Sequence, residues 1–138
     1  MQDFQDQISI FPFKFKHLAA LHELLSSQSY VGVSDIEMKT LPKIGYIAYL
    51  GKTPIAAGFL RRLEPCYAQI DTLCSNGHFG SKARHTGISM IVDALLQDAK
   101  RLKLKGIICH TADSGIIQRA TGLGFHIVSQ TIIALPLP

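Results

Sequence analysis

The segment R-H-T-G-I-S, residues 84–89, combines a cation, a glycine and a small polar residue directly before a long amphipathic stretch. The first backbone N–H groups of a helix have no acceptor within the helix, and the helix dipole favours negative charge there. Gly87 removes a side chain where a ligand would approach the backbone, and Arg84 and His85 add donors. The segment therefore predicts an anion site or, as the plainer alternative, only the start of a helix.

The stretch after this segment has the periodicity of an amphipathic helix. Its apolar residues are spaced by three and four positions from Ile88 to Leu102, and polar residues occupy the opposite face. Residues 106–111 then predict a buried strand, and residues 116–125 predict a short helix that glycine ends, followed by a turn. Residues 126–135 predict a last strand.

Strand-like stretches also precede the segment. Residues 44–50 and 55–63 flank the turn signal G-K-T-P and predict a β-hairpin, and residues 66–74 predict the third strand of this meander. A loop rich in Gly and Ser, residues 75–82, then leads into residues 84–89.

The N-terminal third supplies one more strand and one more helix. Residues 8–15 predict a first strand in which Pro12 indicates an edge, and leucines at helical spacing after His17 predict a helix. Residues 30–42 are irregular or weakly helical. The predicted order is β-α, a three-strand meander and then β-α-β-α-β, which is a mixed α/β fold with a partly parallel sheet.

The composition is that of a globular protein, with 47% hydrophobic and 17% charged residues. At this length we expect residues 1–138 to form a single domain. No apolar run is long enough to span a membrane, and the acidic N-terminus is unlike a signal peptide, so we expect a cytoplasmic protein without membrane partners. The net charge of +4 favours anionic partners, and it fits a phosphate-bearing cofactor as well as a nucleic acid. The basic run at residues 100–105 is more simply the solvated end of a helix, so we expect no nucleic-acid partner.

The cysteines and histidines do not predict a metal site. The chain has three cysteines, Cys66, Cys74 and Cys109. They lie in apolar, strand-like segments without C-x-x-C spacing, which indicates reduced core residues rather than a nucleophile or ligands. His78 and His85 form no recognisable metal spacing with His110, so we expect no metal.

From residue 73 to residue 125, the motif and the order of elements resemble the GNAT superfamily of N-acetyltransferases. In that superfamily R-x-x-G-x-G or R-x-x-G-x-A opens the helix after the fourth strand, and residues 84–89 here read R-x-x-G-x-S. A fifth strand and a short helix ending in Gly-Phe follow in the superfamily, as they do here at Gly124 and Phe125. In element order the resemblance covers about residues 8–135, and it implies the acyl-CoA N-acyltransferase fold.

The resemblance also implies acetyl-CoA as co-substrate and direct transfer of its acetyl group to an amine of a small molecule or protein. The diphosphate of CoA would lie on the backbone amides of the R-x-x-G-x-S segment, and the pantetheine arm would follow the edge of the fourth strand. Backbone donors of that strand would polarise the thioester carbonyl. The implied CoA contacts are Leu73, Cys74, Ser75, Arg84, His85, Thr86, Gly87, Ile88, Ser89 and Asp113.

Two residues are candidates for proton transfer. Asp71 lies on the fourth strand, where members of the superfamily often carry a carboxylate, and is the candidate general base. The alternative for Asp71 is an outward-facing strand residue. His110 ends the predicted fifth strand, where it would relay a proton or make a structural hydrogen bond.

Three features depart from the superfamily. Its usual Tyr, which protonates or positions the departing thiolate, aligns with Ala120, and its usual Asn aligns with Asp113. The loop before Arg84 is longer than usual and would either cover the cofactor or obstruct it. Thirteen residues follow Phe125, which scarcely allows the usual terminal hairpin, so the sheet either ends early or is completed by a partner.

These departures leave two hypotheses for function. The first is a cytoplasmic N-acetyltransferase. The second is a non-catalytic protein that keeps the fold as a structural or interaction component of a larger assembly, for example a phage particle, in which a second copy or another subunit completes the sheet. Ala120 and the short C-terminus favour the second hypothesis, whereas Arg84 and Gly87 favour the first.

Overall fold

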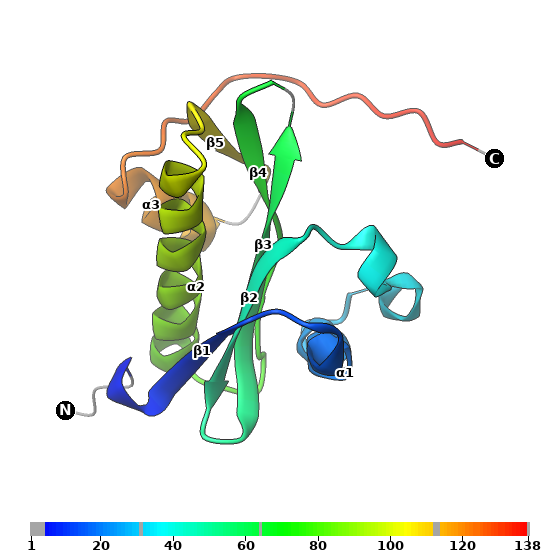
Figure 1. The fold of residues 1–138 in the computed structure, drawn as a ribbon, viewed down its shortest axis with the longest axis vertical. Coiled ribbons are helices and arrows are strands. Elements are labelled where there is room, and N and C mark those ends of the chain that lie inside the picture. Colours follow the sequence, from blue (N-terminus) through cyan, green and yellow to red (C-terminus); the bar gives the residue numbers. More distant parts are fainter. Residues whose placement is uncertain (1–4, 31, 64, 112–113, 138) are drawn as a thin grey trace.

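The centre of the protein is a five-stranded mixed sheet with the strands in the order β1-β2-β3-β4-β5, seen in a computed structural model (Figure 1). The structure describes residues 5–30, 32–63, 65–111 and 114–137. The strands are β1 (Ile8–Pro12), β2 (Ile44–Leu50), β3 (Thr53–Leu63), β4 (Tyr67–Ser75) and β5 (Gly106–Cys109). The first four strands pair antiparallel with their neighbours, and β5 pairs parallel with β4.

Helices cover both faces of the sheet (Figure 1). The helices are α1 (Leu18–Ser26), α2 (Ser81–Arg101) and α3 (Ser114–Gly122). Short 3-10 turns occur at η1 (Gln5–Gln7), η2 (Phe15–His17), η3 (Val33–Asp35) and η4 (Met38–Thr40). Among the described residues, none of the helices is both long enough and apolar enough to cross a membrane.

The core consists of two apolar clusters, one on each side of the sheet. On one side, Ile91 and Leu95 of α2 pack with Leu60 and other side chains of the strands. On the opposite side, Leu21 and Leu24 of α1 pack with Phe59 and its neighbours. Because both sides of the central strands β2 and β3 are covered, their sequences are nearly continuously apolar over residues 44–50 and 54–60, as expected for strands buried on both faces.

The structure confirms most predicted elements and corrects two of them. The hairpin, the meander, the long helix and the parallel strand all form where the sequence predicts them. However, α2 begins at Ser81, so the preceding loop is short and residues 84–89 lie inside the helix. The predicted last strand, residues 126–135, is also wrong for this structure, because residues 126–137 pair with no other strand and form no regular element.

Candidate functional site

β4 changes its direction and loses its outer partner at the same place. Its pairing with β5 ends at Ile70 and Cys109, but β4 continues to Ser75. The register with β3 shifts in this region, and Thr72 has a φ of 51°, a left-handed conformation that is rare for a β-branched residue. The last residues of β4 therefore have a bulged backbone and, among the described residues, no strand on the side of β5.

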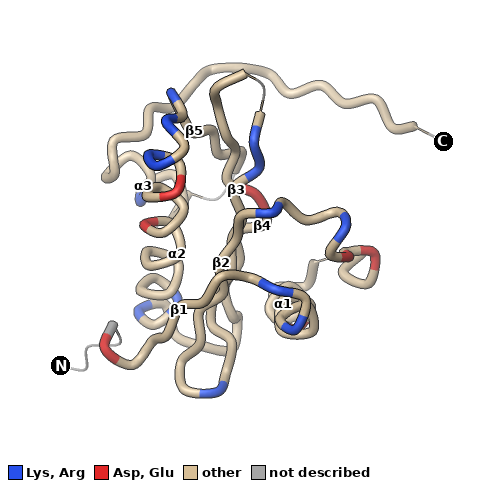
Figure 2. The backbone as a smooth tube through the Cα atoms, viewed as in Figure 1, with Lys and Arg blue, Asp and Glu red and all other residues tan. Residues whose placement is uncertain are grey.

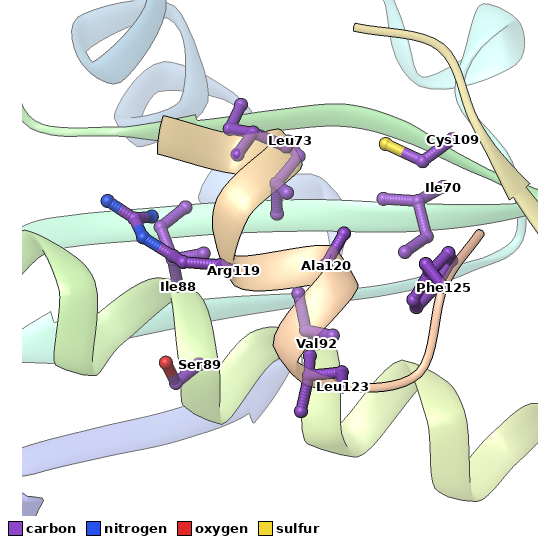
Figure 3. Close-up of a pocket in the computed structure, with 11 residues that line it drawn as sticks. Ile70, Leu73, Ile88, Ser89, Val92, Cys109, Arg119, Ala120, Leu123 and Phe125 are labelled. Atoms are coloured by element: carbon purple, nitrogen blue, oxygen red, sulfur yellow. The ribbon is translucent and has the colours of Figure 1, made fainter. Parts of the chain in front are cut away.

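Two adjoining pockets open between this end of β4, α2 and α3. The mixed pocket is lined by Gln28, Leu73, Cys74, Ser75, Ser81, Arg84, Ile88, Ile116 and Arg119. The apolar pocket, shown in Figure 3, is lined by Ile70, Leu73, Ile88, Ser89, Val92, Cys109, Ile116, Arg119, Ala120, Leu123 and Phe125. The two pockets lie side by side, because Leu73, Ile88, Ile116 and Arg119 line both.

The N-terminus of α2 borders the mixed pocket through Ser81, the first residue of the helix. Gly80 is the N-cap residue, and no side chain caps the helix at this end. The Arg84 N–H already donates to the Gly80 carbonyl at 3.2 Å. The donors without an intrahelical acceptor are therefore the N–H groups of residues 81–83, one turn before the position that the sequence motif indicates.

Gly87 has a packing role that differs from the predicted one. It is buried against β3, and a Cβ atom added to it would lie 3.2 Å from Ile55 Cγ2 and from the Ala56 Cβ. The absence of a side chain therefore allows α2 to approach β3 closely. The space beside Gly87 is occupied by the chain itself and is not open to a ligand.

Two arginines border the mixed pocket. Arg84 is half-buried, and its Nε donates to the Oγ of Ser75, a buried residue at the end of β4, at 3.0 Å. Arg119 of α3 is also half-buried, and its guanidinium extends away from the apolar side chains around Phe125 (Figure 3). Together with the positive end of the α2 dipole, these guanidinium groups favour an anion in the mixed pocket.

Arg119 was not among the predicted site residues. Its signal was present, because Arg119 is a cation in the short helix directly before Ala120. Sequence spacing alone does not show that α3 turns this residue towards the N-terminus of α2.

The loop between β4 and α2 is fixed to the body of the protein. The Asn76 side chain is buried, its Nδ2 donates to the Pro54 carbonyl at 2.9 Å, and its backbone N–H donates to the Ile55 carbonyl at 2.8 Å. The Gly77 N–H donates to the Oγ of Ser27 at 2.9 Å. The loop thus lies against β3 and the end of α1. None of residues 76–80 lines either pocket, so the loop neither covers nor obstructs them.

The predicted CoA contacts divide into three groups. The mixed pocket brings together Leu73, Cys74, Ser75, Arg84 and Ile88. Ser89 lines the apolar pocket only, and His85, Thr86 and Gly87 line neither of the two pockets. Asp113 lies outside the described residues.

Asp71, the candidate base, is paired with Arg61 of the neighbouring strand. The Arg61 Nε donates to Asp71 Oδ2 at 2.5 Å, and the Thr72 hydroxyl donates to Asp71 Oδ1 at 2.9 Å. Another guanidinium nitrogen of Arg61 donates to the Thr40 carbonyl at 3.1 Å. Asp71 follows Ile70, which packs on the α2 side, so Asp71 faces the side of the sheet that α1 covers. The candidate relay His110 is exposed and directly follows β5.

Of the three cysteines predicted as core residues, Cys74 is buried, whereas Cys66 and Cys109 are only partly buried. Burial raises the pKa of the Cys74 thiol to about 12 and also raises the pKa of the half-buried Cys109 thiol. Both therefore remain protonated at neutral pH, which makes them poor nucleophiles. All three cysteines are free thiols. Within the described part of the chain, no group of three or more His, Cys, Asp or Glu side chains could hold a metal ion.

The fold is similar to that of solved acetyltransferases. A GNAT family acetyltransferase from Streptococcus pneumoniae TIGR4 superimposes with a TM-score of 0.76 at 13% identity, covering 94% of this chain and 98% of that one. Rv2747 from Mycobacterium tuberculosis, solved in complex with CoA and NLQ, has a TM-score of 0.70 at 19% identity, covering 91% of this chain and 76% of the other.

A third solved structure is the aminoglycoside N-acetyltransferase AAC(6')-Iy in complex with CoA, with a TM-score of 0.66 at 14% identity and 94% coverage of both chains. No protein-family model and no curated protein matches the sequence. The structural matches establish that the chain has the GNAT acetyltransferase fold.

Proposed function

We propose that the protein is an N-acetyltransferase that moves the acetyl group of acetyl-CoA to an amine. The observation that carries this proposal is the mixed pocket, where Arg84, Arg119 and the N-terminal residue of α2 meet the bulged end of β4. The likeness of the fold to acetyltransferases, two of them solved with CoA, supports the same function.

The residues of the mixed pocket fit the chemistry of CoA. The N–H groups of residues 81–83 and the guanidinium groups of Arg84 and Arg119 would hold the diphosphate, because all of them donate to anionic oxygens. The end of β4, at Leu73–Ser75, would pair with the amides of the pantetheine arm, since β5 no longer occupies that side. Leu73, Ile88 and Ile116 would contact its apolar parts.

When bound, acetyl-CoA supplies an activated acetyl group as a thioester. The backbone N–H groups at the bulge of β4 would donate to the carbonyl oxygen on which negative charge develops. Asp71 lies on the opposite face of the sheet from the mixed pocket, beside the place where β4 extends beyond β5. An amine that approaches from the α1 side would therefore meet Asp71, and we propose Asp71 as the group that takes its proton.

Asp71 retains the capacity for this role despite its two hydrogen bonds. A carboxylate accepts at about four positions, and Arg61 and Thr72 occupy one position on each oxygen. His110, exposed after β5, is proposed as a relay to solvent. Ala120 carries no ionisable proton, so α3 supplies no side-chain acid at that position, and the thiolate of CoA released in the transfer would take its proton from solvent.

The proposal is tested by the binding of acetyl-CoA to the isolated protein. We expect saturating acetyl-CoA to raise the melting temperature, because a ligand that binds only the folded state stabilises it. Arg84→Ala and Arg119→Ala should each remove most of this shift. Arg62→Ala is the matched control, because Arg62 is exposed on β3 and lines neither pocket. If acetyl-CoA causes no shift in the native protein, the transferase proposal fails and a structural role is favoured.

A further inference from the structure

The apolar pocket of Figure 3 lies where β4 and β5 separate. Ile70 and Cys109 form the last pair of residues between the two strands, and both line this pocket. Leu73, further along β4, lines the apolar pocket and also the mixed pocket. The apolar pocket therefore follows β4 from the end of its pairing with β5 towards the bulged end that lines the mixed pocket.

The lining of the apolar pocket suits an uncharged alkyl group. Among the described residues that line it, Arg119 is the only charged one, and its guanidinium extends away from the apolar side chains (Figure 3). β5 and residues 120–137 contain no Lys, Arg, Asp or Glu, so they are tan throughout in Figure 2. A charged group in such a pocket would lose its hydration without gaining a partner, whereas an alkyl group is stabilised by leaving water.

α3 covers the apolar pocket without filling it. None of the described residues of α3 is fully buried, although Ile116 and Ala120 line the pocket. Ala120 points into the same space as Ile70 and Phe125, and the pocket has a volume of about 50 Å³ (Figure 3). By comparison with an apolar cavity of about 150 Å³ in another protein, which binds benzene, this volume accommodates about two carbon atoms.

We propose that the protein transfers acyl groups about two carbons longer than acetyl, with the alkyl chain in the apolar pocket. This inference rests on the proposed binding of an acyl-CoA in the mixed pocket. Leu73 and Ile88 line both pockets, so a thioester held at the bulge of β4 would have its acyl chain directly beside the apolar pocket. The donor is then an uncharged short-chain acyl-CoA such as butyryl-CoA.

The acyl chain and the acceptor amine would occupy opposite sides of the sheet. Ile70, Leu73 and Cys109 pack on the side that α2 covers, whereas Asp71 faces the side of α1. A chain in the apolar pocket would therefore not block an amine that approaches Asp71.

The transfer itself is the same for a longer acyl group as for acetyl. The nitrogen lone pair attacks the thioester carbon, the C–N bond forms, and the C–S bond breaks with its electron pair left on the CoA sulfur. Asp71 takes the proton of the nitrogen and releases it to solvent, and the thiolate takes a proton from solvent. The products are an amide and CoA.

The dissociation constants of acetyl-CoA, butyryl-CoA and succinyl-CoA for the native protein, measured by titration calorimetry, test the inference. Burial of two further methylene groups should make butyryl-CoA bind about tenfold tighter than acetyl-CoA. Succinyl-CoA is the matched control ligand, because its chain is as long as that of butyryl-CoA but ends in a carboxylate. It should bind no tighter than acetyl-CoA, since the apolar pocket would leave the carboxylate unpaired.

Variants of the apolar pocket test where the chain lies. Ala120→Leu fills the pocket from α3 and should remove most of the preference for butyryl-CoA over acetyl-CoA. Gln118→Leu is the matched control and should keep the preference, because Gln118 is exposed on α3 and lines neither pocket. Cys109→Leu fills the same pocket from β5 and serves as the second test if Ala120→Leu does not fold, which circular dichroism checks.

The outcomes separate this inference from the proposed function. If acetyl-CoA and butyryl-CoA bind equally tightly, the inference is overturned and the acetyltransferase proposal stands. A preference for butyryl-CoA that succinyl-CoA shares, or that persists in the folded pocket-filling variants, places the chain elsewhere and also overturns the inference. If none of the three thioesters binds, both proposals fail.

Discussion

The ion pair between Asp71 and Arg61 leaves two roles open for Asp71, which are proton transfer and pairing with Arg61. Their side chains are 23% and 44% exposed, and a pair of this exposure adds little to stability, generally about 0–1 kcal/mol. The contact therefore does not by itself explain why a carboxylate stands at this point of β4. A role in proton transfer and a role as partner of Arg61 predict different kinetics.

We predict that Asp71→Asn slows acetyl transfer by more than tenfold, because the variant keeps the shape and loses the proton acceptor. Arg61→Gln should slow it by much less, since this variant keeps the acceptor and removes only its partner. Both are measured as turnover with acetyl-CoA once an acceptor amine is found, and the acetyl-CoA melting shift of each variant checks that the donor site is intact. If the two variants lose activity equally, Asp71 serves only to hold Arg61.

The packing of α2 on the sheet depends on Gly87. From the sequence, we expected Gly87 to leave room for a ligand beside the backbone. In the structure, Ile55 and Ala56 of β3 lie where a side chain at this position would be. We predict that Gly87→Val destabilises the protein by about 1–3 kcal/mol through overpacking, measured by denaturant unfolding. Gly122→Val in α3 is the control, because no atom lies within 4 Å of a Cβ at that position. Equal stability of both variants would contradict the close approach of α2 to β3.

Elements with local signals were predictable, and elements set by contacts between distant segments were not. The 3.6-residue period of α2 and the turn between β2 and β3 are properties of adjacent residues, so the sequence predicts them correctly. The start of α2 is set by Asn76 and Gly77, which bind Pro54 and Ser27 far away in the chain. No capping box marks that start, so the helix was expected a turn too late.

The candidate site was predictable in the same partial way. A motif and a strand end identify Leu73, Cys74, Ser75 and Arg84, which the structure brings together at the mixed pocket, and their role as CoA contacts stays a prediction. Arg119 joins the site only through the way α3 packs, and the pairing of Asp71 depends on the register of β3 with β4.

At the scale of the whole molecule, the proposed site draws on elements from distant parts of the chain. In the proposed function, Arg84 and the N-terminus of α2 and Arg119 of α3 bind acetyl-CoA at the end of β4 through electrostatic interactions. The strand predicted for residues 126–135 does not form in this structure, because these residues pair with no other strand.

The electrostatic character of this site predicts a response to salt. Raising sodium chloride from low concentration to about 1 M shortens the Debye length from tens of ångströms to about 3 Å. The melting shift caused by a fixed, subsaturating concentration of acetyl-CoA should therefore shrink, because screening weakens the attraction between the guanidinium groups and the diphosphate. Melting curves on one salt series, recorded with and without acetyl-CoA, measure this shift separately from the effect of salt on the protein alone. An acetyl-CoA shift that is as large at high salt as at low salt would contradict the electrostatic assignment.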